Sequence, residues 1–326
     1  MTGKTQIAEM LISNNATLDA QDDISNTPLL WAAYFGYADM VALLLHHKAN
    51  MDIQGNTVFN SGNFGGNDTP LDLAIEQGFA PIAAMLITNG ANLGSHKFYS
   101  DTPLHLATSK ENVELMKLLI AQGANVNARS QASWTMPLTC LDIAVRDNSP
   151  EAVSLLIANG ASIQTQQRTH SWTNTTLFHL WAEGSGNTNI ADQLLAAGCD
   201  PNAKNGDGQT PLHIAVGSKE KSLWLLNHKV DVNAKDNNGQ TPLHLIVTSG
   251  NTNAIQLLLD FKADVNATDN KSKTPLTLLE NLKLNQFHSG RGTRIDFKAV
   301  ENLLLKNGAK GPVLTPDPKS APTDIF

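Results

Sequence analysis

The chain has 326 residues, of which 41% are hydrophobic and 16% are charged, and its net charge is −7. This composition is typical of a folded globular protein and excludes a collagen-like, a fully disordered or a disulfide-stapled chain. The acidic balance argues against a protein that follows the phosphate backbone of a nucleic acid, because such binding needs a cationic stripe.

The predicted elements repeat along the chain. A tetrad that begins Thr-Pro-Leu marks a helix start, because Thr caps a helix through its hydroxyl group and Pro is favoured at the first helical position. Full copies begin at Thr27, Thr69, Thr102, Thr210, Thr241 and Thr274, and degenerate copies begin at Thr139 and Thr176. A small or apolar residue after a Leu-Leu pair ends each unit. The regular spacing is 22 residues within a unit and 11 between units, so the basic repeat is 33 residues.

The sequence pattern of each unit predicts a pair of helices followed by a turn. In the third unit, Val113, Met116, Leu119 and Ile120 recur at helical spacing and give the second helix one apolar face. Gly123 is expected to end this helix in the left-handed conformation that glycine adopts at little cost. Each pair can bury its apolar side only against its neighbours, so the units must stack.

This pattern resembles the ankyrin repeat, with the best copies at residues 102–107, 210–215 and 241–245 and matching linkers at 231–234 and 264–267. The resemblance covers residues 5–310 and implies an all-α repeat solenoid of helix–turn–helix pairs with β-hairpin or finger loops. The sequence therefore predicts one ankyrin-repeat domain over residues 1–310, with a polar half-repeat cap at 1–20, and a disordered Pro-containing tail at 311–326. The expected repeats are 21–53, 54–94, 95–128, 129–164, 165–203, 204–234, 235–267 and 268–310.

No catalytic, cofactor-binding or metal-binding constellation is recognisable. The histidines at the fourth tetrad position are expected to bond the capping Thr and the neighbouring backbone; they are His105, His179, His213 and His244. Asp72 and Asp142 occupy that position in other repeats and lie too far apart to act as paired carboxylates. Gly3-Lys4-Thr5 lacks the upstream glycine and the strand of a phosphate-binding loop. We therefore predict no enzymatic activity, no cofactor and no metal.

Some residues are predicted to be structural. Cys140 and Cys199 lie in apolar runs and are expected to be small buried thiols. Trp31, Trp181 and Trp224 fall on helix positions that face neighbouring units, so we expect them in the core.

The ankyrin resemblance implies a binding surface on the concave side, made by finger tips and inner helices. Three fingers in the N-terminal half are 9, 4 and 4 residues longer than the rest and carry aromatic residues, which are only 6% of the chain. Such residues are enriched in protein-interface hot spots. The predicted protein-binding residues are Tyr34, Phe35, Phe59, Phe64, Phe98, Tyr99, Trp134 and Trp172. The alternative is that these aromatic side chains fold back onto the helices and fill the longer loops.

The function that follows is a non-enzymatic scaffold or adaptor that binds another protein as a monomer. No run of 18 apolar residues and no secretory signal pattern are present, so we expect no membrane contact and a cytoplasmic location. One alternative is an effector, delivered into a host cell by an intracellular bacterium, that occludes a target enzyme. A remoter alternative is an enzyme with a site in the insertions, near His96, His170 or His288.

Two further features leave their interpretation open. Asn233 and Asn266 follow Leu225 and Leu258 by eight residues, a spacing similar to that of substrates of asparaginyl hydroxylases, although a finger turn needs the Asn in any case. The insertion at residues 283–296 is locally basic and is expected to be a solvated loop or a contact for an acidic partner.

Overall fold

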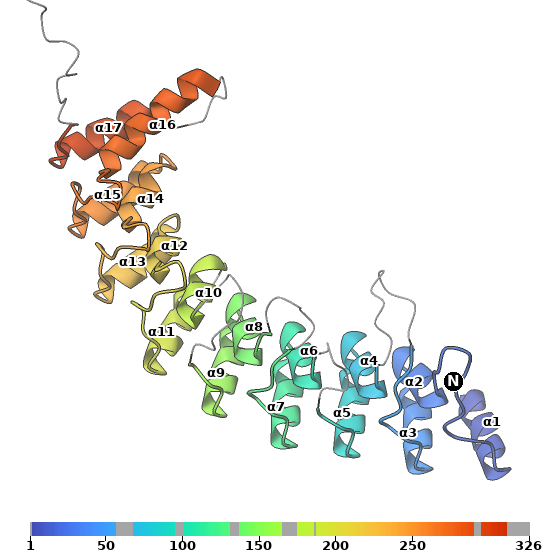
Figure 1. The fold of residues 1–326 in the computed structure, drawn as a ribbon. Coiled ribbons are helices and arrows are strands. Elements are labelled where there is room, and N and C mark those ends of the chain that lie inside the picture. Colours follow the sequence, from blue (N-terminus) through green and yellow to red (C-terminus); the bar gives the residue numbers. More distant parts are fainter. Residues whose placement is uncertain are drawn as a thin grey trace, which may run out of the picture. The chain divides into compact units, whose positions relative to one another are not determined.

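The computed structural model describes residues 2–56, 68–94, 101–130, 137–164, 175–185, 187–289 and 295–311. Within these residues the chain forms seventeen helices and no extended strand (Figure 1). The helices are α1 (Thr2–Ser13), α2 (Pro28–Tyr34), α3 (Ala38–His46), α4 (Pro70–Glu76), α5 (Ala80–Thr88), α6 (Pro103–Ser109), α7 (Val113–Ala121), α8 (Cys140–Arg146), α9 (Pro150–Ala158), α10 (Leu177–Glu183), α11 (Thr188–Ala196), α12 (Pro211–Ala215), α13 (Lys219–Asn227), α14 (Pro242–Val247), α15 (Thr252–Asp260), α16 (Pro275–Ser289) and α17 (Phe297–Lys306). The predicted all-α repeat fold is confirmed.

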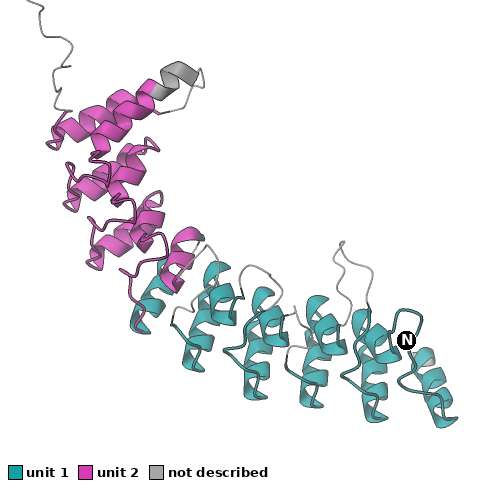
Figure 2. Ribbon diagram, viewed as in Figure 1, with its two compact units in different colours: residues 1–164, 184–197 teal, residues 165–183, 198–326 magenta. Residues whose placement is uncertain are grey.

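The chain divides into two compact units (Figure 2). Unit 1 comprises Met1–Gln164 and Gly184–Ala197, and unit 2 comprises Thr165–Glu183 and Gly198–Phe326. In unit 1 the inner helices α2, α4, α6 and α8 pack one on the next, and the outer helices α1, α3, α5, α7, α9 and α11 form a second layer. In unit 2 the inner helices are α10, α12, α14 and α16, and the outer helices are α13, α15 and α17. The single domain over residues 1–310 stays a prediction.

The tetrads start the inner helices as predicted. At α6 the hydroxyl oxygen of Thr102 accepts the backbone N–H of His105, and Pro103 occupies the first helical position. This arrangement satisfies an amide that would otherwise have no partner at a helix N-terminus. Thr27, Thr69 and Thr139 cap α2, α4 and α8 in the same way; Thr210 and Thr241 form capping boxes at α12 and α14.

Two glycines show why the turns need this residue. Gly123 has a φ of +90° after α7, and a Cβ atom there would meet nothing within 4 Å. Gly239 has a φ of +76°, and a Cβ atom there would lie only 2.7 Å from the backbone nitrogen of Asn270. The first position therefore requires glycine for its backbone conformation alone, and the second also for space.

The core prediction is confirmed for two tryptophans and wrong for the third. Trp181 is fully buried and Trp224 is 8% exposed, and both pack with Phe178 in unit 2. Trp31 is half-buried, and its indole N–H donates to Oδ2 of Asp22 over 2.8 Å. Trp31 lines a pocket with Leu11 and Ile12 of α1, so its ring is only partly covered.

A buried lysine belongs to the aromatic core of unit 2. The Lys221 side chain is 6% exposed, and Nζ donates to the carbonyl oxygens of Trp181 and Ala182, at 2.9 and 3.1 Å. These are among the last carbonyl groups of α10, where a cation is favourable. The Nζ atom also lies 5.6 Å from the centre of the Trp181 ring. Desolvation lowers the pKa of Lys221.

The N-terminal cap exposes polar residues as predicted, among them Glu9 and Ser13. Helix α1 packs on α3 as an outer helix, and Glu9 lies 3.2 Å from the ring Nε2 of His47. The same helix exposes three large apolar side chains, however: Ile7 is 61% exposed, Met10 67% and Leu11 57%. The exposed surface of the cap is therefore partly apolar.

Two other predictions need correction. Residues 283–289 continue α16 rather than form a loop, because no glycine or proline interrupts the sequence before Gly290. The rest of the insertion, with Arg291 and Arg294, lies outside the described residues until Ile295.

Cys140 is buried as predicted, whereas Cys199 is only half-buried. The predicted tail at 311–326 lies outside the described residues except for Gly311.

Candidate functional site

Two of the eight predicted binding residues lie in the described part of the chain. Tyr34 is half-buried at the end of α2, and Phe35, directly after it, is 52% exposed. The other six lie outside the described residues, and their place in a binding surface stays a prediction. These six are Phe59, Phe64, Phe98, Tyr99, Trp134 and Trp172.

The described site is a cluster of four aromatic rings around the end of α2, which we call the α2 aromatic cluster. Trp31 stacks on Phe35 with ring centres 5.6 Å apart, and Phe35 stacks on Tyr37 at 5.8 Å. The Tyr34 ring meets the edges of Trp31 and Phe35 at 6.0 and 5.1 Å. Gly36 lets the chain turn here with a φ of +75°. Because Phe35 and Tyr37 are 52% and 42% exposed, the cluster presents aromatic surface to solvent.

A carboxylate lies at one end of this cluster. Oδ2 of Asp22 accepts the indole N–H of Trp31 at 2.8 Å, and Oδ1 accepts the backbone N–H groups of Ile24 and Asn26 at 3.1 and 2.8 Å. The bond from Trp31 and then those from Asn26 and Ile24 lower the pKa of Asp22, against the opposing effect of desolvation. The site therefore combines stacked rings with a fixed negative charge, an arrangement that suits a partner with an apolar surface and a cationic side chain.

The sequence prediction found only half of this cluster. Trp31, Tyr34 and Phe35 stand at i, i+3 and i+4, a spacing that places side chains on one helix face. The same spacing could have identified Trp31 as a member of the cluster, but Trp31 was predicted to be buried in the core. Tyr37 and Asp22 were missed because they lie in turns, where spacing does not show which side chains meet.

The tetrad histidines are structural, as predicted. In each case ring Nδ1 accepts from the N–H of the capping Thr, so Nε2 carries the proton and donates to a carbonyl oxygen of the next repeat. The acceptors are the carbonyl oxygens of Leu138, Gln209, Gln240 and Lys273, at 2.8 to 3.2 Å. Burial lowers the pKa of all four rings, which favours their neutral form.

In two repeats an aspartate takes the place of the tetrad histidine and bonds the capping Thr. Oδ2 of Asp72 accepts the backbone N–H of Thr69 at 3.0 Å and its hydroxyl at 2.8 Å. Oδ2 of Asp142 makes the equivalent contacts with Thr139 at 2.9 and 3.0 Å. Both carboxylates therefore close helix starts.

In unit 2 the fingers bond to one another. The backbone N–H of Asn237 donates to the carbonyl oxygen of Asp207, and that of Asn270 donates to that of Asn238, both over 2.9 Å. The side-chain amide of Asn237 also donates to the carbonyl oxygen of Gly206 at 2.8 Å. These finger tips therefore use their polar groups within the stack and present no aromatic surface.

Finger asparagines join consecutive repeats. The Asn233 side chain donates to the carbonyl oxygen of Lys262 at 3.3 Å and accepts the N–H of Asp264 at 2.7 Å. Asn127 and Asn266 make the equivalent pair of bonds. Hydroxylation of Asn233 and Asn266 stays a hypothesis.

Among the described residues, no group of three or more His, Cys, Asp or Glu side chains is arranged to hold a metal ion. None of the described helices is both long enough and apolar enough to cross a bilayer.

The chain is similar to known repeat proteins over most of its length. A family model of ankyrin repeats in three copies matches residues 1–97, 53–130, 93–167, 141–236 and 178–269. The chain is 36% identical over 212 residues to palmitoyltransferase ZDHHC13 of Mus musculus, which covers 64% of this chain and 31% of the relative. It is 36% identical over 83 residues to an ankyrin repeat-containing protein of Treponema pallidum, covering 26% of each. It is 48% identical over 79 residues to an ankyrin repeat protein of Fowlpox virus, covering 24% of this chain and 22% of the relative. The chain thus spans less than a third of the length of the palmitoyltransferase that it matches.

Proposed function

Because the chain belongs to the ankyrin-repeat family, we propose that it is a non-enzymatic scaffold or adaptor that binds a partner protein on its inner helices and fingers. Repeats of this family imply protein–protein interaction. The observation that supports this particular surface is the α2 aromatic cluster, in which Phe35 is 52% exposed. A contiguous apolar patch on a soluble protein marks an interaction site, and aromatic residues dominate such sites.

The non-enzymatic part of the proposal has its own support. The four tetrad histidines use both ring nitrogens in structural hydrogen bonds, so none of them is available as a general base. The activity named for the palmitoyltransferases is not transferred, because the match covers only 31% of ZDHHC13 and falls in its ankyrin-repeat portion. The six predicted aromatic residues outside the described part, the monomeric state and the cytoplasmic location remain parts of the proposal.

The test compares partner capture by three forms of the full chain. The intact chain, a Tyr34→Ala/Phe35→Ala double variant and a Leu223→Ala control are used as baits in a lysate of the source organism, and bound proteins are quantified by mass spectrometry. Leu223 is 37% exposed on α13, so the control removes exposed apolar surface elsewhere. We expect the double variant to recover about tenfold less of the partner than the other two baits.

Circular dichroism spectra must show equal helical content in all three proteins. Equal recovery of the same partners by the double variant and by the intact chain would contradict binding through the α2 aromatic cluster.

A further inference from the structure

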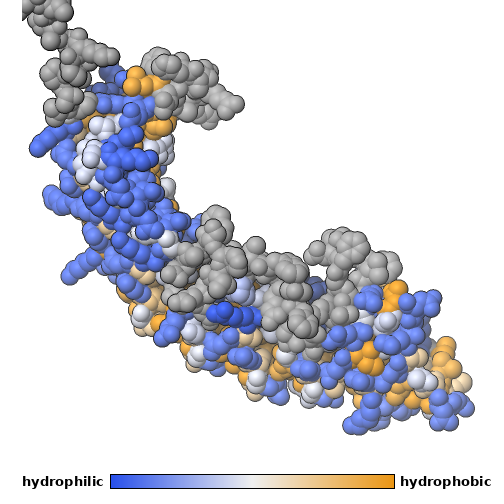
Figure 3. All heavy atoms as spheres, in the orientation of Figure 1, coloured by the Kyte–Doolittle hydropathy of each residue, from blue (hydrophilic) through white to orange (hydrophobic). Residues whose placement is uncertain are grey.

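The strongest feature outside this surface is the exposed apolar face of α1. Ile7, Met10 and Leu11 stand at i, i+3 and i+4, so they form one stripe, and each is more than half exposed. Figure 3 shows hydrophobic residues at this N-terminal end of the molecule. Single exposed apolar residues are ordinary, whereas a stripe in which Leu11 also lines a pocket is a reason to look for a binding partner.

A pocket of about 330 Å³ lies between α1, α2 and α3. Leu11 and Ile12 of α1 form one side, and Trp31 and Ala32 of α2 form the other, with Tyr37 between the helices. Its lining is almost entirely apolar. Trp31, which was expected to be buried in the core, is one of its lining residues.

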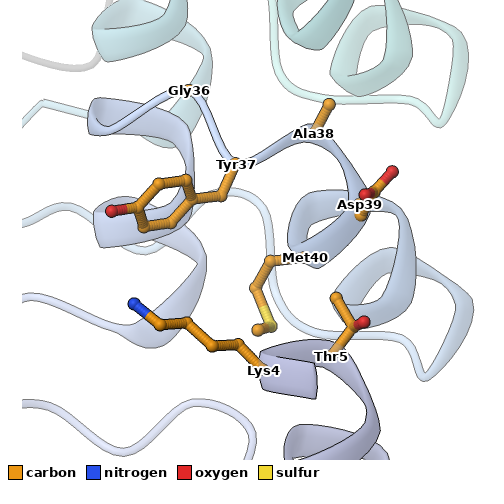
Figure 4. A pocket seen from close by; sticks show the side chains of 7 residues that line it. All are labelled: Lys4, Thr5, Gly36, Tyr37, Ala38, Asp39 and Met40. Carbon is orange, nitrogen blue, oxygen red and sulfur yellow. The ribbon is translucent and has the colours of Figure 1, made fainter. Parts of the chain in front are cut away.

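A second pocket of about 530 Å³ continues along the same helices (Figure 4). It is lined by Lys4 and Thr5 of α1, by Tyr37 in the turn, and by Asp39 and Met40 of α3. Both pockets share Tyr37 and Met40, so they adjoin. We call the two pockets together the α1 groove.

The packing of unit 1 indicates what shape fits this groove. Each of α4 and α6 lies between two inner helices, and each of α3, α5, α7 and α9 is paired with an inner helix of its own repeat. Helix α1 packs on α3, and the described residues supply no inner helix to pair with it. A helix seated in the groove would meet α1 and α2 as α4 meets α5 and α6. The inner helices α2 and α4 are seven residues long, so a bound helix about 10 Å in length would match them.

The charges around the groove indicate the polar edge of the occupant. Asp22 lies beside Trp31 at one end, with its carboxylate fixed by three N–H donors. Asp23 next to it is exposed. At the other end Asp39 and Lys4 line the pocket wall. A helix with Lys or Arg near Asp22 would therefore be complementary in charge.

We propose that the α1 groove binds an amphipathic helix of a partner protein, with Leu, Ile or Met anchors on its apolar face and Lys or Arg beside Asp22. Helix-in-groove recognition of this kind places anchors at i, i+3, i+4 and i+7. The site goes beyond the proposed function, because Leu11 of α1 and Met40 of α3 belong to it, although it shares Trp31 and Tyr37 with the α2 aromatic cluster. Leu11 lines the groove and is not part of the aromatic cluster, so it can be replaced while the cluster is left unchanged.

The test uses the full chain and three fluorescent synthetic peptides of about 14 residues. The first is an amphipathic helix of Leu, Ala and Lys with Leu at i, i+3, i+4 and i+7. The second carries Glu in place of Lys, and the third is a scrambled version of the first without an apolar face. Binding is measured by fluorescence anisotropy, and its location by methyl NMR of methionine. Met40 lines the groove, whereas Met116 is fully buried in α7 and serves as an internal reference.

We expect the Lys peptide to bind and to shift the Met40 methyl signal but not that of Met116. Leu11→Asp should weaken binding about tenfold, although it adds a negative charge that attracts a cationic peptide. The matched control Leu305→Asp, at a position 46% exposed on α17, should bind like the intact chain. The Glu peptide and the scrambled peptide should each bind about tenfold more weakly than the Lys peptide.

The proposal is wrong if Leu11→Asp and Leu305→Asp bind alike, if the scrambled peptide binds as well as the Lys peptide, or if Met40 does not respond. A dimeric chain that becomes monomeric in Leu11→Asp would also overturn it, because a second copy would then cover the stripe. Leu11→Asp leaves Tyr34 and Phe35 unchanged and should capture the partner of the proposed function as the intact chain does, which separates this result from the test of the proposed function.

Discussion

The ring Nε2–H of His244 donates to the carbonyl oxygen of Lys273, 3.1 Å away at the start of the next repeat. On the other side of the ring, Nδ1 accepts the backbone N–H of Thr241 at 3.1 Å. Protonation would place a second N–H against that backbone N–H, so the folded chain favours the neutral ring. The same geometry recurs at His105, His179 and His213, and it links the helix start of one repeat to the backbone of the next.

We expect the chain to lose stability as the pH falls from about 7.5 to about 5. Burial lowers the pKa of all four tetrad histidines in the folded chain, so the unfolded chain takes up protons at a higher pH than the folded chain does. Their stabilising effect is complete above the unfolded pKa of about 6.5 and is lost as the pH falls below it. Urea midpoints followed by circular dichroism measure this change. His244→Gln should reduce the pH dependence, and midpoints that do not change with pH would contradict the expectation.

Replacing Lys221 by methionine should destabilise unit 2 by about 1–3 kcal/mol. Methionine keeps the apolar stem but leaves the carbonyl oxygens of Trp181 and Ala182 without the two bonds from Nζ. Urea unfolding followed by Trp fluorescence reports on this region, because Trp181 and Trp224 lie in the same core. The matched control is Lys219→Met, at an exposed position two residues earlier, which should stay within about 0.5 kcal/mol of the intact chain. Equal effects of the two substitutions would refute this role of Lys221.

Two glycine substitutions should differ in cost. Gly123→Ala adds only the strain of a positive φ, about 1 kcal/mol, because no atom lies within 4 Å of the new Cβ. Gly239→Ala adds the same strain and a contact 2.7 Å from the backbone nitrogen of Asn270, so we expect about 2–4 kcal/mol. The comparison is made by urea unfolding of both variants. A Gly123→Ala variant that is equally or more destabilised would show that the finger contact is not tightly held.

The two thiols should react at different rates in the folded chain. Burial raises the pKa of Cys140 to about 12 and that of Cys199 to about 11, so neither is a reactive thiolate at neutral pH. Cys199 is half-buried and should react slowly with a thiol reagent, whereas Cys140 should react only after unfolding. Cys140→Ser and Cys199→Ser assign the two phases. Reaction of Cys140 at the rate of Cys199 in the native chain would contradict its burial.

Much of this architecture could be predicted because its signals are local. A capping Thr, a Pro at the first helical turn and a glycine after the second helix each act over a few residues, so the sequence shows them directly. The exposure of Trp31 could not be predicted in this way, because it depends on which helix lies in front of α2. Lys221 has no sequence signal for the same reason: a lysine in a helix normally points to solvent, and the carbonyl groups it meets are about 40 residues earlier in the chain.

For the candidate site, the sequence predicted aromatic residues on an inner helix, and the structure places Tyr34 at the end of α2 and Phe35 directly after it. It did not show that Tyr37 would join them across the turn at Gly36. The apolar stripe of α1 was hidden as well, because a predicted terminal cap was expected to expose polar residues. The apolar character of Ile7 and Leu11 is evident from the sequence, but their exposure follows only from tertiary packing.

The joints between repeats also expose the chain to a form of chemical ageing. Each joining asparagine uses both ends of its amide: in Asn233, Nδ2 donates to Lys262 and Oδ1 accepts from Asp264. Spontaneous deamidation to aspartate would replace the donor with a negatively charged oxygen facing a carbonyl oxygen. The contact between this side chain and the next repeat would then change from attractive to repulsive, while the hydrophobic core stayed unchanged. In stored protein the hydrogen bonds between neighbouring repeats should therefore be lost one pair at a time. The order of their loss would follow the deamidation rates of Asn127, Asn233 and Asn266.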